Sequence, residues 1–257
     1  FKKGDVSVQA IILAAGMGNR LRPLTEIMPK PLVKVHGIPL IETVVRGLEK
    51  RGVQKIFVVV GYMGEKFDYL IKKYQNVEIV KNNEYLEKNN ISSLKAVGDV
   101  LGSADCFICE ADLYVADTEV FQKAHRNSCY YAKAVKGYSE DWVFETREDR
   151  IVRITKGAYD AYNMAGISYW QKEDAGRIKE KIDEVYGLEG HEKLFWDEVV
   201  DRILDRMDVR VCEVPEQSVF EIDTVEDLRK LEAWEGSCGT ILTNNEICRG
   251  DLGAFRS

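Results

Sequence analysis

The chain has 257 residues, of which 45% are hydrophobic and 31% charged, and this composition is that of a soluble globular protein with a sizeable core. A formal net charge of −7 excludes the basic footprint of a general nucleic-acid binder, so no nucleic-acid partner is expected. No segment reaches the roughly 18 apolar residues of a membrane span and no signal-peptide pattern is visible. We therefore expect no membrane partner and a cytoplasmic location.

Strand-length apolar runs alternate with helical patterns through the first half of the chain. Residues 8–15 and 55–60 read as strands, and 39–52 reads as a helix with Pro39 near its start and Gly52 just past its end. The same alternation continues with helices over 64–74 and 91–100 and strands over 77–80 and 105–111. It predicts an α/β fold with a mixed, mostly parallel central sheet that is covered on both faces.

The pattern changes from about 129 to 170, where strands are separated by turns, and this predicts a small antiparallel insertion. Helices at about 171–186 and 193–206, strands at 209–214 and 219–222, and a helix at 224–235 follow. We expect one domain over residues 1–235. The tail, residues 236–257, has no clear period, and the chain starts without Met, which suggests a piece of a longer polypeptide.

The six cysteines do not form an evident disulfide framework, since a chain of this length has a core and needs no covalent staples. Cys106 and Cys109 form a CxxC inside the strand expected at 105–111. The two-residue period of a strand points these thiols to opposite faces, which is poor geometry for a zinc site.

A glycine-containing loop follows the first strand. Gly16-Met17-Gly18 invites a dinucleotide-binding interpretation, but Leu21 stands where the third glycine belongs and prolines interrupt any helix. A Walker-type Gly-Lys-Ser/Thr is also absent from the loop. What remains is a long loop, stiffened by prolines, at the sheet edge where open α/β proteins bind ligands.

The loop contains the residue types that a polyphosphate-binding site needs. Gly16 and Gly18 allow backbone N–H groups to approach phosphate oxygens closely, and Arg20 and Lys30 supply neutralising charge. The alternative is a solvated loop with scattered surface charges.

Three carboxylates are candidates for Mg²⁺. Asp112 follows an apolar strand, and Glu221 and Asp223 are two residues apart, so a strand points both to one face. Mg²⁺ prefers a few hard oxygens and completes its shell with water and phosphate. Alternatively, Asp112 caps the turn that follows it, and Asp223 or Thr224 caps the last helix.

The run G-x-G-x-R-L-x-P-L-T-x-x-x-P-K-P-L at 16–32 resembles the signature of nucleotidyltransferases, and bacterial CTP:phosphocholine cytidylyltransferases above all. The resemblance extends over about residues 9–234. It implies a nucleotide-diphospho-sugar-transferase-like α/β/α sandwich that uses Mg²⁺. The implied reaction joins CTP and phosphocholine into CDP-choline and pyrophosphate, by direct attack of the acceptor phosphate on the α-phosphorus.

The resemblance also implies roles for individual residues. Arg20 and Lys30 are the catalytic cations, and Asp112, Asp223 and Glu221 hold the metal. The implied nucleotide-binding positions are Ala14, Ala15, Gly16, Gly18, Gly61, Tyr62, Asn89, Asn90 and Ser92. For Asn90, capping of the helix that follows is an equal alternative.

The acceptor's head group is expected to contact aromatic faces and a carboxylate, because a quaternary ammonium cannot donate a hydrogen bond. The resemblance places this choline site at Trp142, Tyr169, Trp196, Asp197 and, less directly, Tyr85. For each aromatic residue the alternative is core packing. Lys136 or Lys156 would hold the acceptor's phosphate.

Other functions stay open at this point. Aminoethylphosphonate cytidylyltransferases resemble the same family, and their primary ammonium substrate needs more carboxylates and fewer rings, which Glu140, Asp141 and Asp197 could provide. A sugar-1-phosphate nucleotidyltransferase and a silent binding module are further alternatives. The oligomeric state is open between a homodimer and a fusion to another domain.

Overall fold

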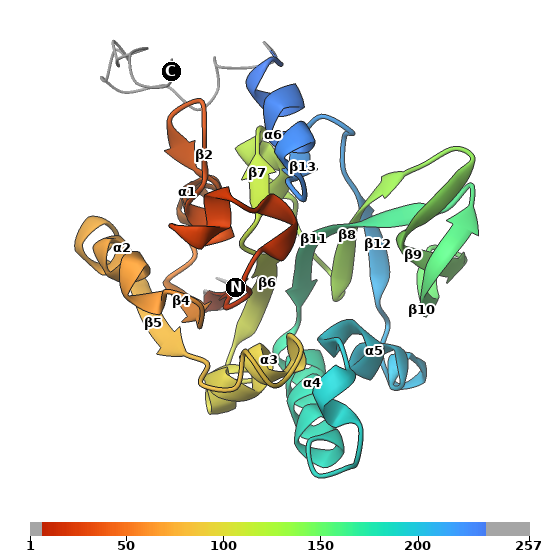
Figure 1. Ribbon diagram of the computed structural model, residues 1–257. Coiled ribbons are helices and arrows are strands. Elements are labelled where there is room, and N and C mark those ends of the chain that lie inside the picture. The colour runs from red at the N-terminus through yellow and green to blue at the C-terminus, as the bar shows by residue number, and fades with distance from the viewer. Residues whose placement is uncertain (1–6, 235–257) are drawn as a thin grey trace, which may run out of the picture.

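A nine-stranded sheet, ordered β5-β4-β1-β6-β11-β8-β12-β10-β9, forms the centre of the protein in this computed structural model, which describes residues 7–234 (Figure 1). The strands of this sheet are β1 (Val8–Ala14), β4 (Lys55–Val60), β5 (Val77–Lys81), β6 (Asp105–Glu110), β8 (Cys129–Ala134), β9 (Tyr138–Arg147), β10 (Arg150–Tyr159), β11 (Tyr162–Trp170) and β12 (Arg210–Glu213). Two small sheets are made by β2 (Lys34–Val35) with β3 (Ile38–Pro39), and by β7 (Leu113–Val115) with β13 (Val219–Glu221).

Helices cover both faces of the sheet. They are α1 (Leu40–Arg51), α2 (Asp68–Lys73), α3 (Ile91–Val97), α4 (Lys172–Val185), α5 (Trp196–Asp201) and α6 (Val225–Glu232). Apolar side chains of α1 and α2 pack on one face, and those of α3, α4 and α5 pack on the other. The predicted α/β sandwich with a mixed sheet is therefore confirmed, and α6 closes a third apolar cluster beside β2 and β7.

The sheet has a parallel half and a largely antiparallel half. Strands β5, β4, β1 and β6 are parallel neighbours, whereas β11 runs antiparallel to both β6 and β8. The strands between residues 129 and 170 thus extend the central sheet, with β9 and β10 as its far edge. The tail expected at 236–257 lies outside the described residues.

The order of the parallel strands positions the site. The chain passes from β1 to β4 and β5 on one side and then returns to β6 on the other side of β1. Such a reversal leaves a crevice outside the carboxyl ends of the two central strands. The loop after Ala14 and the acids after β6 begin at this edge.

The helix expected at 193–206 is shorter than predicted. It begins at Trp196, because the Glu198 carboxylate accepts a hydrogen bond from the backbone N–H of Phe195 at 2.8 Å and caps the first turn. It ends at Asp201, and a separate 3-10 turn follows at Leu204–Arg206. Among residues 7–234, no helix is long and apolar enough to cross a membrane.

Candidate active site

The loop after β1 folds into three short 3-10 turns instead of a helix. Gly18 has a φ of 62°, and a Cβ at this position would lie 2.7 Å from Lys30 Cβ, so both backbone conformation and space require glycine. The Thr25 hydroxyl donates to Gly18 O at 2.9 Å and fixes the turn. The loop is thereby folded back so that Lys30 lies beside Gly18.

Tyr62 supports this loop from β4's carboxyl end. Its backbone N–H donates to Ala15 O at 3.1 Å and its hydroxyl donates to Thr25 O at 2.9 Å. Neither Gly61 nor Tyr62 lines the cavity described next; Gly61 instead gives room to the Tyr85 ring, whose Cγ would lie 2.6 Å from a Cβ. The contacts of this pair position the loop.

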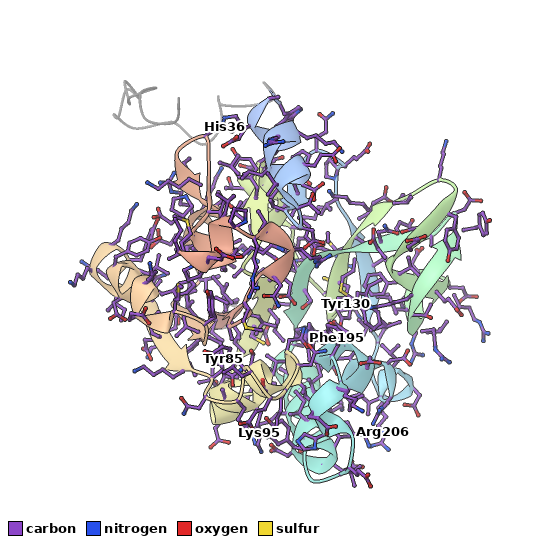
Figure 2. All side chains as sticks on the ribbon, viewed as in Figure 1. His36, Tyr85, Lys95, Tyr130, Phe195 and Arg206 are labelled. Atoms are coloured by element: carbon purple, nitrogen blue, oxygen red, sulfur yellow. The ribbon has the colours of Figure 1, made fainter. Side chains whose placement is uncertain are left out.

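A cavity of about 410 Å³ opens at the carboxyl ends of β1 and β6. It brings together most of the residues expected to bind nucleotide, metal and phosphate, and one residue, Tyr85, expected at the acceptor site. These are Ala14, Ala15, Gly16, Gly18, Arg20, Lys30, Tyr85, Asn89, Asn90, Ser92 and Asp112. Tyr85, beside α3, is labelled in Figure 2. Segments from four separate parts of the sequence thus share one concave surface.

Three carboxylates meet beside Lys30. Oxygens of Asp112, Glu221 and Asp223 lie within 4.8 Å of one another, although β6 and β13 are far apart in the sequence. The Lys30 ammonium contacts Asp112 Oδ2 at 2.6 Å and Asp223 Oδ1 at 2.8 Å. The exposed Arg20 guanidinium also contacts Asp223 Oδ1 at 2.8 Å.

This acidic group suits a divalent cation. Asp112 Oδ1 is buried and accepts no hydrogen bond from any described residue. Burial of its carboxyl group and the negative charges of Asp112 and Asp223 raise the pKa of Glu221 to about 8, although other atoms of the residue are exposed. A divalent cation would bind Asp112 Oδ1 and would reduce the repulsion between Glu221 and its acidic neighbours. The alternative that Asp223 caps α6 does not describe the structure, since Thr224 and Asp227 form that cap.

Two further carboxyl groups, those of Glu110 and Asp197, lie next to this acidic group. Glu110 lines the main cavity and also a small cavity of about 10 Å³, next to Trp196 and Tyr130. Burial and the charges of Asp112, Asp197 and Glu221 raise the pKa of Glu110 well above its usual range. Burial also raises the pKa of Asp197 to about 7, and Tyr130 donates to Asp197 Oδ1 at 2.9 Å. Glu110 therefore lies close enough to interact with Asp112 and Glu221 on one side and with Asp197 on the other.

The aromatic residues expected to form a cage do not enclose a common space. Trp196 is 3% exposed and packs against Tyr130 and Trp170 on one face of the sheet. Tyr169 packs on the opposite face. Of the five expected residues, Trp196 and Asp197 begin α5, and neither the Trp196 ring nor Tyr169 presents an open face.

Trp142 is half-buried, unlike Trp196 and Tyr169. It packs edge-on against Phe195, with ring centroids 5.6 Å apart. The Lys156 ammonium lies 4.8 Å from the Trp142 centroid and 5.3 Å from that of Phe195. A cation of the protein itself therefore already occupies the aromatic surface beside Phe195, which Figure 2 labels at the start of α5.

Seven residues that line the main cavity were not among the expected site residues: Leu13, Asn19, Pro31, Asn82, Lys88, Ser93 and Glu110. Glu110 carried a usable signal, because it precedes Asp112 by two residues at the end of the strand and so shares its side of the chain. Asn82 is buried, and its amide donates to the hydroxyls of Ser92 and Ser93 at 2.9 and 3.2 Å. That network joins the end of β5 to α3 and has no local sequence signature.

The chain is similar to characterised proteins over this whole architecture. The nucleotidyl transferase family model matches residues 9–140. A 2-aminoethylphosphonate cytidylyltransferase of Lancefieldella rimae is 47% identical over 85% of this chain and 89% of its own length. A choline-phosphate cytidylyltransferase of Streptococcus pneumoniae is 36% identical over 88% of this chain and 97% of its own.

The solved structures include a similar fold. A CTP:phosphocholine cytidylyltransferase from Streptococcus pneumoniae has a TM-score of 0.81 and 35% identity, covering 88% of this chain and 98% of that chain. The family model and these full-length relatives agree with the loop, cavity and sheet described above. The chain therefore belongs to the nucleotidyl transferase family, as a cytidylyltransferase of the group that resembles CTP:phosphocholine cytidylyltransferases.

Proposed function

We propose that this cytidylyltransferase transfers the cytidylyl group of CTP to 2-aminoethylphosphonate and releases pyrophosphate. A phosphonate oxygen of the acceptor would attack the α-phosphorus, and the bond from that phosphorus to the leaving pyrophosphate would break. No covalent intermediate with the protein is needed, so catalysis depends on positioning and charge stabilisation.

The triphosphate would lie in the main cavity, against the backbone at Gly16 and Gly18. Arg20 and Lys30 would turn from their carboxylate partners to the phosphates and neutralise charge on the departing pyrophosphate. Asp112, Asp223 and Glu221 would hold Mg²⁺, which would neutralise negative charge on the phosphates. The partnerless Asp112 Oδ1 supports this role.

The small cavity beside Glu110 would bind the acceptor's ammonium group and so select between the candidate acceptors. Its volume of about 10 Å³ is close to the minimum for one water molecule, which favours a primary ammonium over the larger trimethylammonium. Glu110 lines this cavity, and Asp197 is near enough to Glu110 to raise its pKa. Two carboxyl groups that resist ionisation together are well suited to one organic cation.

The aromatic surfaces support the same choice. A quaternary ammonium is attracted to open ring faces. Trp196 and Tyr169 are packed within the protein, and Lys156 lies over Trp142 and Phe195. The higher identity to the 2-aminoethylphosphonate enzyme than to the choline-phosphate enzyme, 47% against 36%, points in the same direction.

Phosphocholine is the second candidate acceptor, because this chain covers 97% of the choline-phosphate relative and shares its fold with the solved CTP:phosphocholine cytidylyltransferase. Release of pyrophosphate from CTP and Mg²⁺ should be measured with each acceptor and with phosphoethanolamine. We expect the highest kcat/KM with 2-aminoethylphosphonate. A higher kcat/KM with phosphocholine would reverse the assignment, and equal activity with UTP or with sugar 1-phosphates would contradict both.

A further inference from the structure

A cluster of one histidine and two cysteines lies outside the proposed active site. Donor atoms of His125, Cys129 and Cys212 all lie within 4.8 Å of one another. His125 precedes β8, Cys129 begins β8, and Cys212 lies on β12, the parallel neighbour of β8. None of the three lines the main cavity.

The histidine ring is held in an orientation that leaves one nitrogen for a ligand. His125 Nε2 lies 3.0 Å from the Tyr131 hydroxyl, and Nδ1 lies 3.3 Å from Cys129 Sγ. The ring also stacks on Tyr169, with centroids 4.4 Å apart. If Nε2–H donates to Tyr131, the Nδ1 lone pair faces the thiols. Metal-bound histidines commonly have this arrangement, with the second nitrogen fixed by a hydrogen bond.

The charge and protonation of the surroundings also suit metal ligands. Burial, with the charges of Arg51 and Lys123, lowers the pKa of His125 to about 4, so the imidazole is neutral near pH 7. The hydrogen bond between the two thiols lowers the pKa of Cys212 to about 7 and, together with burial, raises the pKa of Cys129, so the ion must displace the proton of Cys129. Cys129 is 4% exposed and Cys212 half-buried, so an ion here would be shielded on most sides yet reachable.

We propose that His125, Cys129 and Cys212 bind one Zn²⁺ ion, with a water molecule as fourth ligand. Zinc bonds of about 2.3 Å to sulfur and 2.0–2.1 Å to nitrogen place tetrahedral ligand atoms about 3.5–3.8 Å apart. The separations of the three donor atoms need only small adjustments to reach this range. Each cysteine thiol releases its proton to solvent when the ion binds. The ion links the segment before β8 to β12.

Cobalt(II) provides a direct test, because cobalt–thiolate coordination absorbs visible and near-ultraviolet light whereas carboxylate sites give no sulfur charge-transfer band. The full chain, reduced and freed of metal, is titrated with Co²⁺ and then with Zn²⁺. We expect one equivalent of thiolate-bound Co²⁺, its displacement by Zn²⁺, and a higher melting temperature with Zn²⁺. Absence of a sulfur charge-transfer band in the reduced wild type would overturn the proposal.

Matched variants assign the signal to these residues. Cys212→Ser should abolish the band, whereas Cys106→Ser, on the opposite face of the sheet, should retain it. The double variant Cys238→Ser/Cys248→Ser should also retain it, which excludes the two cysteines of the tail. Tyr131→Phe removes only the hydroxyl that orients His125 and should weaken Zn²⁺ binding about 10- to 100-fold. A band that survives Cys212→Ser, or an affinity unchanged by Tyr131→Phe, would contradict the site.

Discussion

Lys30 Nζ lies 2.6 Å from Asp112 Oδ2, although 82 positions separate the two residues in the chain. The same ammonium contacts Asp223 Oδ1, so one buried cation joins acids that follow β6 and β13. Burial opposes the charge on Lys30, but the two carboxylates outweigh it and raise its pKa. The lysine therefore remains charged at the position where phosphate and metal are proposed to meet.

Replacing Lys30 by methionine keeps the length of the side chain and removes its charge. We expect the kcat for pyrophosphate release to fall at least about 100-fold, because a preorganised charge at the reacting phosphate is lost. Lys34→Met changes an exposed lysine on β2 and is the matched control, which should keep the wild-type rate. Near-normal turnover in Lys30→Met would remove this residue from the mechanism.

Gly18→Ala and Gly16→Ala separate the folding of the loop from its binding of phosphate. A Cβ on Gly18 meets Lys30 and requires a left-handed backbone, whereas a Cβ on Gly16 meets no atom within 4 Å. Gly18→Ala should cost at least about 1 kcal/mol of stability, or a few degrees in melting temperature. Gly16→Ala should melt as the wild type does.

Both alanine variants should have a raised KM for CTP, since both glycines line the cavity. Steady-state kinetics at saturating acceptor will measure this effect, and thermal melts without ligand will measure stability. Equal melting temperatures for the two variants would contradict the strain assigned to Gly18.

The raised pKa of Asp197 should make the stability of the protein depend on pH. Its pKa in the folded protein is raised to about 7, so the folded state holds a proton that the unfolded state releases at lower pH. The stabilising effect is complete below the unfolded pKa and is lost as pH rises through about 7. Asp197→Asn removes this titration while keeping an oxygen that can accept from Tyr130.

Between pH 5 and pH 8, the wild type should therefore lose roughly 2–3 kcal/mol of stability relative to Asp197→Asn. Denaturant unfolding of both proteins at the two pH values will measure the difference. Glu189→Gln, which changes an exposed acid of the segment before α5, is the matched control and should follow the wild type. Parallel pH profiles for wild type and Asp197→Asn would show that Asp197 does not titrate in this range.

The parts of the structure that depend on local pattern were predictable from sequence. The α1 helix between Pro39 and Gly52 and the strand β4 that follows were confirmed because apolar period and helix-end residues act locally. Asp112 and Asp223 also meet as predicted, because β7 begins directly after Asp112 and pairs with β13, which ends two residues before Asp223.

The acceptor site depends on tertiary packing and was less predictable. Whether an aromatic ring faces a ligand or the core is decided by neighbours distant in sequence: Tyr169 stacks on His125, and Trp196 packs on Tyr130. No spacing rule indicates that Lys156 lies over Trp142. The His125–Cys129–Cys212 cluster was hidden for the same reason, since Cys212 reaches it only through the pairing of β12 with β8.

Glu110 is expected to determine the preference for a primary ammonium. Glu110→Gln keeps the size of the side chain but removes the charge that would attract the acceptor's ammonium next to Asp197. A charged hydrogen bond is worth about 1.5–3 kcal/mol, so the KM for 2-aminoethylphosphonate should rise roughly 10- to 150-fold. The KM for CTP should change far less, because Gly16, Gly18 and Arg20 remain.

Glu221→Gln is the matched comparison, since it also neutralises one carboxylate of the same acidic region. This variant should raise the Mg²⁺ concentration needed for half-maximal rate and leave the KM for the acceptor nearly unchanged. The two variants thus separate an ammonium site from a metal site that share a boundary at Asp112. If Glu110→Gln raised the Mg²⁺ requirement and left the acceptor's KM unaltered, Glu110 would belong to the metal, and the ammonium would bind elsewhere.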